Sequence, residues 1–537
     1  MRTSIQNPFL LPVLIVSRNL LLAGRAPAQT FTNLHSFGST PTDGLQPSSG
    51  LVLAGNILYG TTDGGGSSSN GAVFSVHTDG TGYTNLYSFT AAAITNSPGF
   101  YTNSDGSEPG GGYVPGSRLV LWGNILYGTA AAGGSGGQGT IFKVHTDGTG
   151  FTNLHSFTAL DASFYTNSDG ANPDNDLILS NNTLYGTAYQ GGSSNNGVVF
   201  RVNTDGTGFT NLHSFTDSYG DYPVGGLILS GNILYGTTDV GGSAGNGTVF
   251  AVNTDGTGFT NLYSFSAISS HLGTTLVTNS DGANPDSGLV LSGSTLYGTT
   301  SQGGMNGWFA NGSNGYNGSY GSGTVFKINT DGTGFTNLHS FAAATPNPTS
   351  IFHGWTNSEG TTPYAGLIVL GNTLYGTANN GGSSGNGTVF ALNTDGTGFT
   401  VLYNFTAGSI NSSATYTNSD GAGPYWNLNL SGNILYGTTT SGGIYGKPYL
   451  GAAGSGDGTL FSLTLPRPLL TIIRSTANVI LSWPTNAAGL SFTLQSTTNL
   501  VSPAVWTSVS PASAVVSGQN TVTNPISGAQ QFYRLSQ

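Results

Sequence analysis

Short runs of apolar and β-branched residues alternate along most of the chain with runs of Gly, Asn and Asp. One unit of the pattern has such runs at residues 226–230, 233–238, 248–253 and 259–265. Runs of this composition, bounded by turn-forming residues, predict β-strands. No segment shows a convincing helical periodicity, so we predict an all-β chain with four strands in each unit.

Three phrases recur seven times each and define the units. Leu-Tyr-Gly-Thr, in the second strand, places its tyrosine at Tyr59, Tyr127, Tyr185, Tyr235, Tyr297, Tyr375 and Tyr436. Gly-x-Val-Phe or a close variant, in the third strand, ends at Phe74, Phe142, Phe200, Phe250, Phe326, Phe390 and Phe461. Phe-Thr-Asn-Leu-His/Tyr-Ser-Phe or a variant begins the fourth strand at Phe31, Tyr83, Phe151, Phe209, Phe259, Phe335 and Phe399.

The predicted turns agree with this assignment. Pairs such as Gly231-Asn232 lie between the first and second strands, and Asn181 replaces the glycine in one unit. A two-residue hairpin needs positive φ angles, which Gly and Asn tolerate. Asp-Gly pairs lie between the third and fourth strands and predict a second set of tight turns.

Units of four strands repeated seven times predict a seven-bladed β-propeller, because propellers have 4–8 blades of four strands. The first phrase, at residues 31–37, is a fourth strand without its unit, whereas the last unit ends at Leu463 without a fourth strand. We therefore predict that the N-terminal strand completes the last blade and closes the ring.

The Leu-Tyr-Gly-Thr-Thr…Gly-Gly…Gly-Thr-Val-Phe…Asp-Gly pattern over residues 31–465 resembles the GloVer family of bacterial extracellular tandem repeats. The resemblance implies a secreted or surface-displayed β-propeller with no established activity.

The two ends of the chain differ from the repeats. Residues 1–28 read as a signal peptide, with Arg2, an apolar core and an Ala26-Pro27-Ala28 cleavage site, and predict a secreted or cell-surface protein. No run of 18 apolar residues occurs, so we expect no integral membrane span in the mature chain. Residues 29–465 form the predicted propeller. Residues 466–537 follow a Pro-rich hinge, read as a small β-sandwich and are similar to fibronectin-III-like modules.

The composition of the chain excludes some classes of partner and of metal site. The chain has 11 Lys and Arg against 22 Asp and Glu, a net charge of −11, and no Cys. Nucleic-acid binding needs clustered cations, so we expect no nucleic-acid partner. Disulfides and thiolate metal sites are excluded. The repeated Asn-Ser-Asp-Gly-x-x-Pro loops have no EF-hand spacing and read as turns rather than calcium sites. We predict no metal and no cofactor, and a monomer.

The loops that vary in length all fall on one predicted face, between the second and third strands and between successive units, and variable loops on a rigid scaffold usually carry function. Aromatic residues in these loops are our predicted ligand-binding residues. They are Trp308, Phe309, Tyr316, Tyr320, Trp355, Tyr425, Trp426, Tyr445 and Tyr449. Aromatic rings stack on the apolar faces of sugars. Alternatively, these rings anchor long loops to the scaffold.

Catalysis finds little support in the sequence. Most histidines lie at repeated strand positions where Tyr replaces them in other units, and the chain has only two Glu, Glu108 and Glu359. We predict no catalytic residue and a non-enzymatic binding or adhesion protein whose partner is extracellular polysaccharide or a cell-surface protein. The alternatives are a structural surface protein without a discrete ligand, and a glycan-active hydrolase or lyase with carboxylates from different blades.

Overall fold

The computed structural model describes most of the repeat region and parts of the C-terminal segment. The described residues are 29–40, 42–94, 101–107, 118–270, 277–306, 321–346, 355–410, 416–445, 457–466, 470–475, 478–484, 493–498, 505–509, 513–516, 519–525 and 531–536. They contain strands and no helix, and therefore no helix that could span a membrane. Within this part of the chain, the all-β prediction is confirmed.

Each repeat unit contributes four antiparallel strands to a sheet, as predicted, and the sheet of the first unit has a fifth strand, β2 (Gly44–Pro47). The first strands are β3 (Val52–Ala54), β9 (Val120–Trp122), β13 (Ile178–Ser180), β17 (Asp221–Ser230), β23 (Val290–Ser292), β29 (Ile368–Leu370) and β35 (Asn429–Ser431). The second strands are β4 (Ile57–Gly65), β10 (Ile125–Ala130), β14 (Thr183–Ala188), β18 (Ile233–Val240), β24 (Thr295–Thr300), β30 (Thr373–Ala378) and β36 (Ile434–Thr439).

The third and fourth strands of each sheet follow in the same order of sheets as above. The third strands are β5 (Ala72–His77), β11 (Thr140–His145), β15 (Val198–Asn203), β19 (Thr248–Asn253), β25 (Thr324–Asn329), β31 (Thr388–Asn393) and β38 (Thr459–Thr464). The fourth strands are β6 (Thr84–Ser88), β12 (Thr152–Ser156), β16 (Thr210–Ser214), β20 (Thr260–Ser264), β26 (Thr336–Ser340), β32 (Thr400–Asn404) and β1 (Thr30–Ser36).

Short additional strands lie in the loops. They are β2 (Gly44–Pro47), β7 (Ala93–Ile94), β8 (Tyr101–Thr102), β21 (Ser269–Ser270), β22 (Val277–Thr278), β27 (Thr345–Pro346), β28 (Trp355–Thr356), β33 (Ser409–Ile410), β34 (Tyr416–Ala422) and β37 (Ser441–Gly443).

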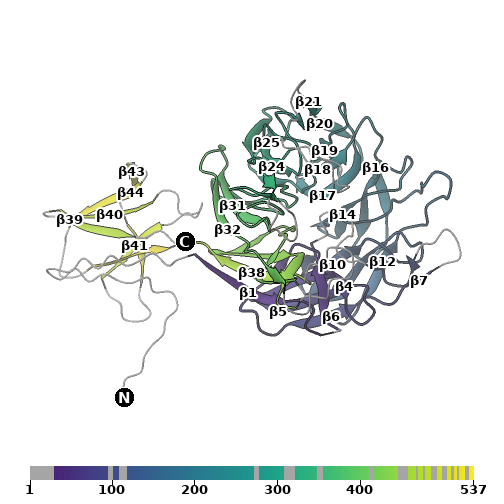
Figure 1. Cartoon of the computed structure of the whole chain (residues 1–537), viewed down its shortest axis with the longest axis horizontal. Helices are drawn as coiled ribbons and strands as arrows, with labels where there is room; N and C mark the ends of the chain where they lie inside the picture. The colour runs from purple at the N-terminus through teal and green to yellow at the C-terminus, as the bar shows by residue number, and fades with distance from the viewer. Residues whose placement is uncertain are drawn as a thin grey trace, which may run out of the picture.

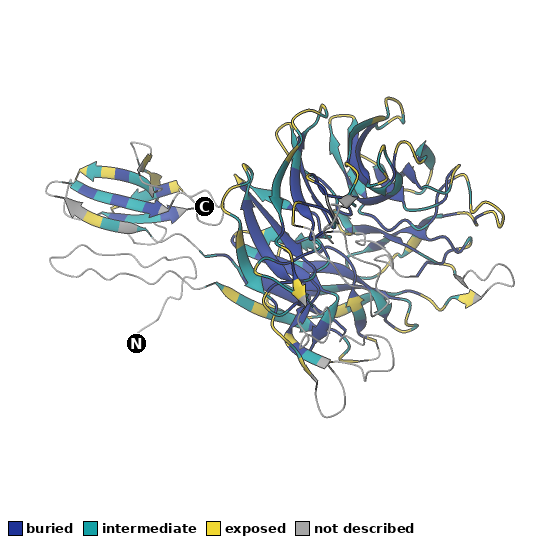
Figure 2. Ribbon diagram, turned by 45° about the horizontal axis from the view of Figure 1, so that its top comes forward, coloured by how far each residue is buried: buried dark blue, intermediate teal, exposed yellow. Residues whose placement is uncertain are grey.

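The sheets are arranged around a common axis, which gives the repeat region a β-propeller-like fold (Figure 1). Their apolar side chains are buried between neighbouring sheets, and the exposed residues lie mainly in the loops (Figure 2). One such layer packs Tyr127, Ile141 and Phe157 of one sheet against Leu184 and Phe200 of the next. The repeated phenylalanine of the third strand is fully buried, as Phe200 and Phe250 illustrate.

The N-terminal strand completes the last sheet. β1 pairs antiparallel with β38, from Thr30 opposite Thr464 to Ser36 opposite Thr459, and the strand order is β1-β38-β36-β35 (Figure 1). The ring of Phe31 stacks on Tyr403, with centroids 4.2 Å apart. The predicted pairing of the two ends of the repeat region is therefore present.

Two further sheets lie in the C-terminal segment, with strand orders β39-β40-β44-β43 and β42-β41-β45. Their strands are β39 (Thr471–Ser475), β40 (Asn478–Pro484), β41 (Thr493–Thr497), β42 (Thr507–Ser508), β43 (Ala514–Val516), β44 (Gln519–Pro525) and β45 (Phe532–Ser536). Both sheets contribute to one apolar cluster that includes Leu481, Trp483, Leu494 and Leu535.

The repeated loop aspartate links the fourth strand to the loop that follows it. Asp169 Oδ2 lies 3.0 Å from His155 Nε2 and accepts a hydrogen bond from the backbone N–H of Thr158 at 3.1 Å. In another sheet, the hydroxyl of Tyr263 donates to Asp281 Oδ2 at 2.9 Å. His and Tyr can each place a donor at the same carboxylate, which explains why they interchange in the sequence. Burial alone would raise the pKa of Asp169, but the hydrogen bonds from His155 and Thr158 lower it.

His213 is the exception to this arrangement. Tyr219 occupies the place of the loop aspartate, and His213 Nε2 is buried without a hydrogen-bond partner among the described residues. Burial lowers the pKa of His213 to about 4. The unfolded chain therefore binds more protons at this residue below pH ~6.5, and stability is lost as the pH falls toward the folded pKa.

We expect the substitution Tyr219→Asp to raise the pKa of His213 by about one unit or more, because a carboxylate partner favours the imidazolium form. NMR titration of the histidine ring protons measures the effect, with His155 as an internal reference that already has such a partner. A His213 pKa that stays near 4 in the variant would contradict this account of the loop aspartate.

Candidate functional site

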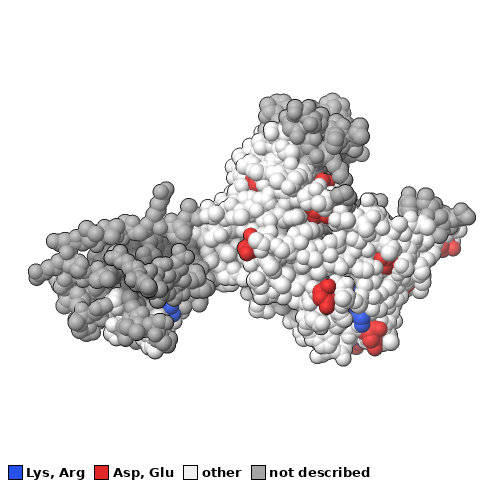
Figure 3. Space-filling model, turned by 90° about the horizontal axis from the view of Figure 1, so that it is seen from below, with Lys and Arg blue, Asp and Glu red and all other residues white. Residues whose placement is uncertain are grey.

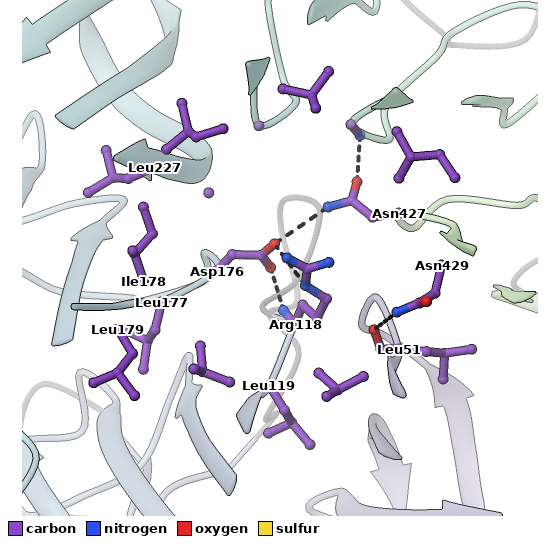
Figure 4. A pocket seen from close by; sticks show the side chains of 18 of the residues that line it. Leu51, Arg118, Leu119, Asp176, Leu177, Ile178, Leu179, Leu227, Asn427 and Asn429 are labelled. Atoms are coloured by element: carbon purple, nitrogen blue, oxygen red, sulfur yellow. Dashed lines mark hydrogen bonds and ion pairs between the residues drawn. The ribbon is translucent and has the colours of Figure 1, made fainter. Parts of the chain in front are cut away.

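The first strands of the sheets surround a central cavity of about 850 Å³ (Figure 4). Each of these strands pairs only with the second strand of its own sheet, so it forms one edge of that sheet. The cavity is lined by residues 51–53, 118–121, 176–180, 226–229, 288–290, 366–368 and 427–429. Its wall is therefore built from positions far apart in the sequence.

Three polar side chains meet at one end of this cavity (Figure 4). Asp176 Oδ2 lies 3.8 Å from Arg118 Nε, and the backbone N–H of Arg118 donates to Asp176 Oδ1. Asn427 Nδ2 donates to Asp176 Oδ2 at 3.5 Å, and Asn427 Oδ1 accepts from the backbone N–H of Gly366 at 2.5 Å. We call Arg118, Asp176 and Asn427 the polar plug, because they join four sheets across the axis.

In the other four sheets, the position that corresponds to Arg118, Asp176 and Asn427 is a glycine. Gly50, Gly226, Gly288 and Gly366 stand at the corresponding positions of the other sheets. A Cβ atom on Gly226 would lie only 2.5 Å from the Cβ of Asp176, so a side chain there would collide with the plug. Burial raises the pKa of Asp176, although the charge of Arg118 opposes the shift.

A second group of polar and aromatic side chains lies on the other side of the plug. It comprises Tyr189, Tyr222, Asp239, Asp286, Tyr364 and Tyr425, which we call the tyrosine–aspartate cluster. They lie at or just after the end of a second strand, or at or before the start of a first strand, so they belong to the face that carries the variable loops. The rings of Tyr189 and Tyr222 stack with centroids 4.8 Å apart, and those of Tyr364 and Tyr425 with centroids 4.6 Å apart.

Charged groups in the cluster shift the pKa values of their neighbours. Burial raises the pKa of Asp286 well above its usual value, and the neighbouring charge and carboxyl group of Asp239 raise it further. Burial and the charges of these two aspartates also raise the pKa of Tyr364. Asp239 Oδ1 accepts a hydrogen bond from Asn284 Nδ2 at 2.8 Å. Because two adjacent carboxylates repel each other, Asp286 keeps its proton to a higher pH than an isolated aspartate does.

The loops around the cluster contain residues with unusual backbone conformations. Asn172, Tyr222, Asn284 and Thr362 each precede a proline and have φ between 53° and 58°. The backbone N–H of Asn284 donates to the carbonyl of Asn246 in the neighbouring sheet at 3.0 Å. Positive φ is rare for a bulky residue, and such outliers concentrate at functional sites. Tyr222, whose φ is positive, stacks its ring on Tyr189.

Comparison with known proteins places part of the chain in a family. Residues 99–310 match the family model described as the Gloeobacter/Verrucomicrobia repeat. This segment belongs to that repeat family. The resemblance identified from the sequence is thereby confirmed, and the same three phrases continue on both sides of the matched Gloeobacter/Verrucomicrobia repeats. No curated protein matches the chain.

Several solved structures are distantly similar to this chain. A GH74 enzyme of Niastella koreensis has 17% identity and a TM-score of 0.44, over 85% of this chain and 59% of that enzyme. An oligogalacturonate lyase from Vibrio parahaemolyticus has 10% identity and a TM-score of 0.40, over 83% and 99%. A chain of a nidogen/laminin complex has 13% identity and a TM-score of 0.33, over 63% and 88%. At this level of similarity, none of them supplies a function.

The structure describes four of the ring residues predicted from the sequence. Tyr425 belongs to the tyrosine–aspartate cluster, and Tyr445 is exposed. Trp355 is half-buried in β28. Trp426 is buried, and its indole N–H donates to the carbonyl of Pro47 at 2.6 Å, so its ring packs between sheets and exposes little surface to a ligand. Trp308, Phe309, Tyr316, Tyr320 and Tyr449 lie outside the described residues.

The sequence analysis did not identify the other members of the cluster or the polar plug. Their signal can be found by aligning the repeat units, because Tyr189 and Asp239 occupy the same position after Leu-Tyr-Gly-Thr-x. Asp286, Tyr364 and Tyr425 likewise each follow the repeated loop proline. The residue type at these two positions differs between units.

Proposed function

We propose that this chain is an exported, seven-bladed β-propeller that binds extracellular polysaccharide without converting it. Residues 29–465 would form the closed propeller, and residues 466–537 a small β-sandwich that serves as a spacer or attachment domain. The signal-peptide pattern of residues 1–28 supports export. The pairing of β1 with β38 supports the closed ring.

The observation that carries the proposal is the tyrosine–aspartate cluster. Its four tyrosines form two stacked pairs, and each ring is only partly buried. Partly exposed aromatic rings offer apolar faces to sugar rings, and carboxyl oxygens accept hydrogen bonds from sugar hydroxyls. A few convergent polar groups among aromatic walls are typical of ligand sites.

The charge distribution also favours a neutral partner. Acidic side chains are scattered singly over the face drawn in Figure 3, and basic ones are few. Charged residues make up only 6% of the chain, with an excess of acidic ones. A polyanion would be repelled by this surface, whereas a neutral polysaccharide would not.

The two carboxyls of the cluster lie close together. Asp239 and Asp286 lie so close together that the charge and the carboxyl group of Asp239 raise the pKa of Asp286. Glycosidases hold their two carboxyls about 5–9.5 Å apart so that the glycosidic bond fits between them. This contact favours binding over hydrolysis at the cluster.

Affinity electrophoresis of the full mature chain through a panel of polysaccharides tests the proposal. We expect one glycan to retard the protein, and the double substitution Tyr364→Ala/Tyr425→Ala to remove most of the retardation, because it removes one stacked pair. The matched control is Phe164→Ala/Tyr165→Ala, two exposed loop rings outside the cluster. A thermal melt of each variant establishes that it is folded.

Two results would contradict the proposal. If no polysaccharide retards the protein, or if the Tyr364/Tyr425 variant is retarded like the wild type, then the cluster does not bind glycan. Released oligosaccharide in the same mixtures would instead identify a glycan-active enzyme.

A further inference from the structure

We propose that the central cavity is a second binding site, independent of the glycan site, for a small aliphatic carboxylate. The cavity lies on the other side of the polar plug from the tyrosine–aspartate cluster. Its lining begins at Arg118 and Asp176 and continues along the first strands toward their hairpin turns, and no residue of the cluster lines it.

The side wall of this cavity is aliphatic. Corresponding positions of the first strands supply Val52, Val120, Ile178, Ile228, Val290 and Ile368. Each of these side chains is only partly buried, so each retains surface that a ligand can cover. β-branched side chains have few rotamers, so the wall is largely preformed. An aliphatic chain would gain free energy by leaving water for this wall.

The end of the cavity beside the polar plug carries a cation. Arg118 is the only Lys or Arg among the lining residues, and 43% of its side chain is exposed. Among the described residues, its one ion pair is the 3.8 Å contact between Nε and Asp176 Oδ2. A guanidinium has five N–H donors in a fork that matches a carboxylate, so most of them remain available to a ligand.

Asp176 would repel a bound anion less strongly than a free carboxylate would. Asp176 Oδ1 already accepts the backbone N–H of Arg118, and Oδ2 faces Asn427 Nδ2. Burial also raises the pKa of Asp176, which favours its neutral form. The plug therefore presents the guanidinium as its main charge to the cavity.

The dimensions suit a ligand of medium length. Four residues of extended strand separate Arg118 from Trp122, a distance of about 13 Å at 3.3 Å per residue. Trp122 ends β9, next to lining residues 118–121, and is 48% exposed. A carboxylate bound at Arg118 would thus extend its aliphatic chain along the Val and Ile side chains toward this indole.

Isothermal titration of octanoate into the full mature chain tests the proposal. We expect saturable binding of one octanoate per chain. Arg118→Gln should weaken it by about tenfold or more, since it removes the charged partner. Arg201→Gln, on β15 outside the cavity, is the matched control and should leave the affinity unchanged. The neutral probe 1-octanol should bind at least about tenfold more weakly than octanoate.

A second variant keeps the test decisive if Arg118→Gln does not fold. Asn429 lines the cavity and donates to the carbonyl of Leu51 at 3.2 Å. Asn429→Asp nearly preserves its shape but adds a negative charge, which should also weaken octanoate binding. Absence of saturable binding, affinity unchanged in both variants, or equal affinity for 1-octanol would each overturn the proposal. None of these results depends on the glycan site.

Discussion

Deletion of residues 30–36 is expected to destabilise the repeat region by roughly 5 kcal/mol or more, a larger effect than that of a typical single substitution. The deletion removes β1, which pairs with β38 over its whole length. It also removes Phe31, whose ring stacks on Tyr403 and Phe461. Truncating one buried aromatic side chain alone costs about 3–5 kcal/mol. Without β1, the backbone groups of β38 would form an open sheet edge.

Calorimetric melting of the mature chain with and without residues 30–36 measures this effect. A synthetic peptide of residues 29–38 provides the control, because its addition should restore part of the lost thermal midpoint if β1 acts through pairing with β38. If the truncated chain melted at the wild-type midpoint, β1 would not hold the two ends of the repeat region together.

The substitution Gly236→Ala is expected to destabilise the repeat region by about 2–3 kcal/mol. Gly236 is the glycine of Leu-Tyr-Gly-Thr in β18. A Cβ atom there would lie 2.6 Å from Phe250 Cζ and 2.9 Å from Leu227 Cδ2. Phe250 is fully buried, so its ring cannot move aside without displacing its own neighbours. Equilibrium unfolding in urea, followed by near-ultraviolet circular dichroism, measures the change.

Gly231→Asn is the matched control for this substitution. Gly231 lies five residues earlier, in the hairpin turn, with φ of 61° and nothing within 4 Å of an added Cβ. Asn181 occupies the same turn position in another sheet with φ of 53°. We expect a change within about 0.5 kcal/mol. Equal stability of Gly236→Ala and the wild type would show that the repeated glycine does not make room for the phenylalanine.

The strands and hairpins were predictable because their signals are local. Alternating aliphatic runs and Gly-Asn or Asp-Gly pairs fix each strand and turn within about ten residues of sequence. In the C-terminal segment, β39, β43 and β44 were not predicted. The short run of β43 and the polar composition of β44 (Gln519–Pro525) do not resemble a half-buried strand, and both depend on the neighbouring strands with which they pair.

The candidate sites were not predictable in the same way, since their residues come from different sheets. Asp176 and Asn427 are 251 residues apart and meet only across the axis. Trp426 seemed a candidate ligand-binding ring, but burial against Pro47 is a tertiary contact that its loop sequence does not encode. The role of Gly236 likewise requires the position of Phe250, on the next strand.

Isothermal titration with the shortest oligosaccharide of a retarding glycan tests the proposed function most directly. The account predicts that one oligosaccharide binds per chain and that Tyr364→Ala/Tyr425→Ala weakens binding at least about tenfold. Arg118→Gln, in the polar plug and outside the tyrosine–aspartate cluster, should leave it unchanged. If the tyrosine variant bound like the wild type, or if only Arg118→Gln reduced the affinity, the tyrosine–aspartate cluster would not be the glycan site.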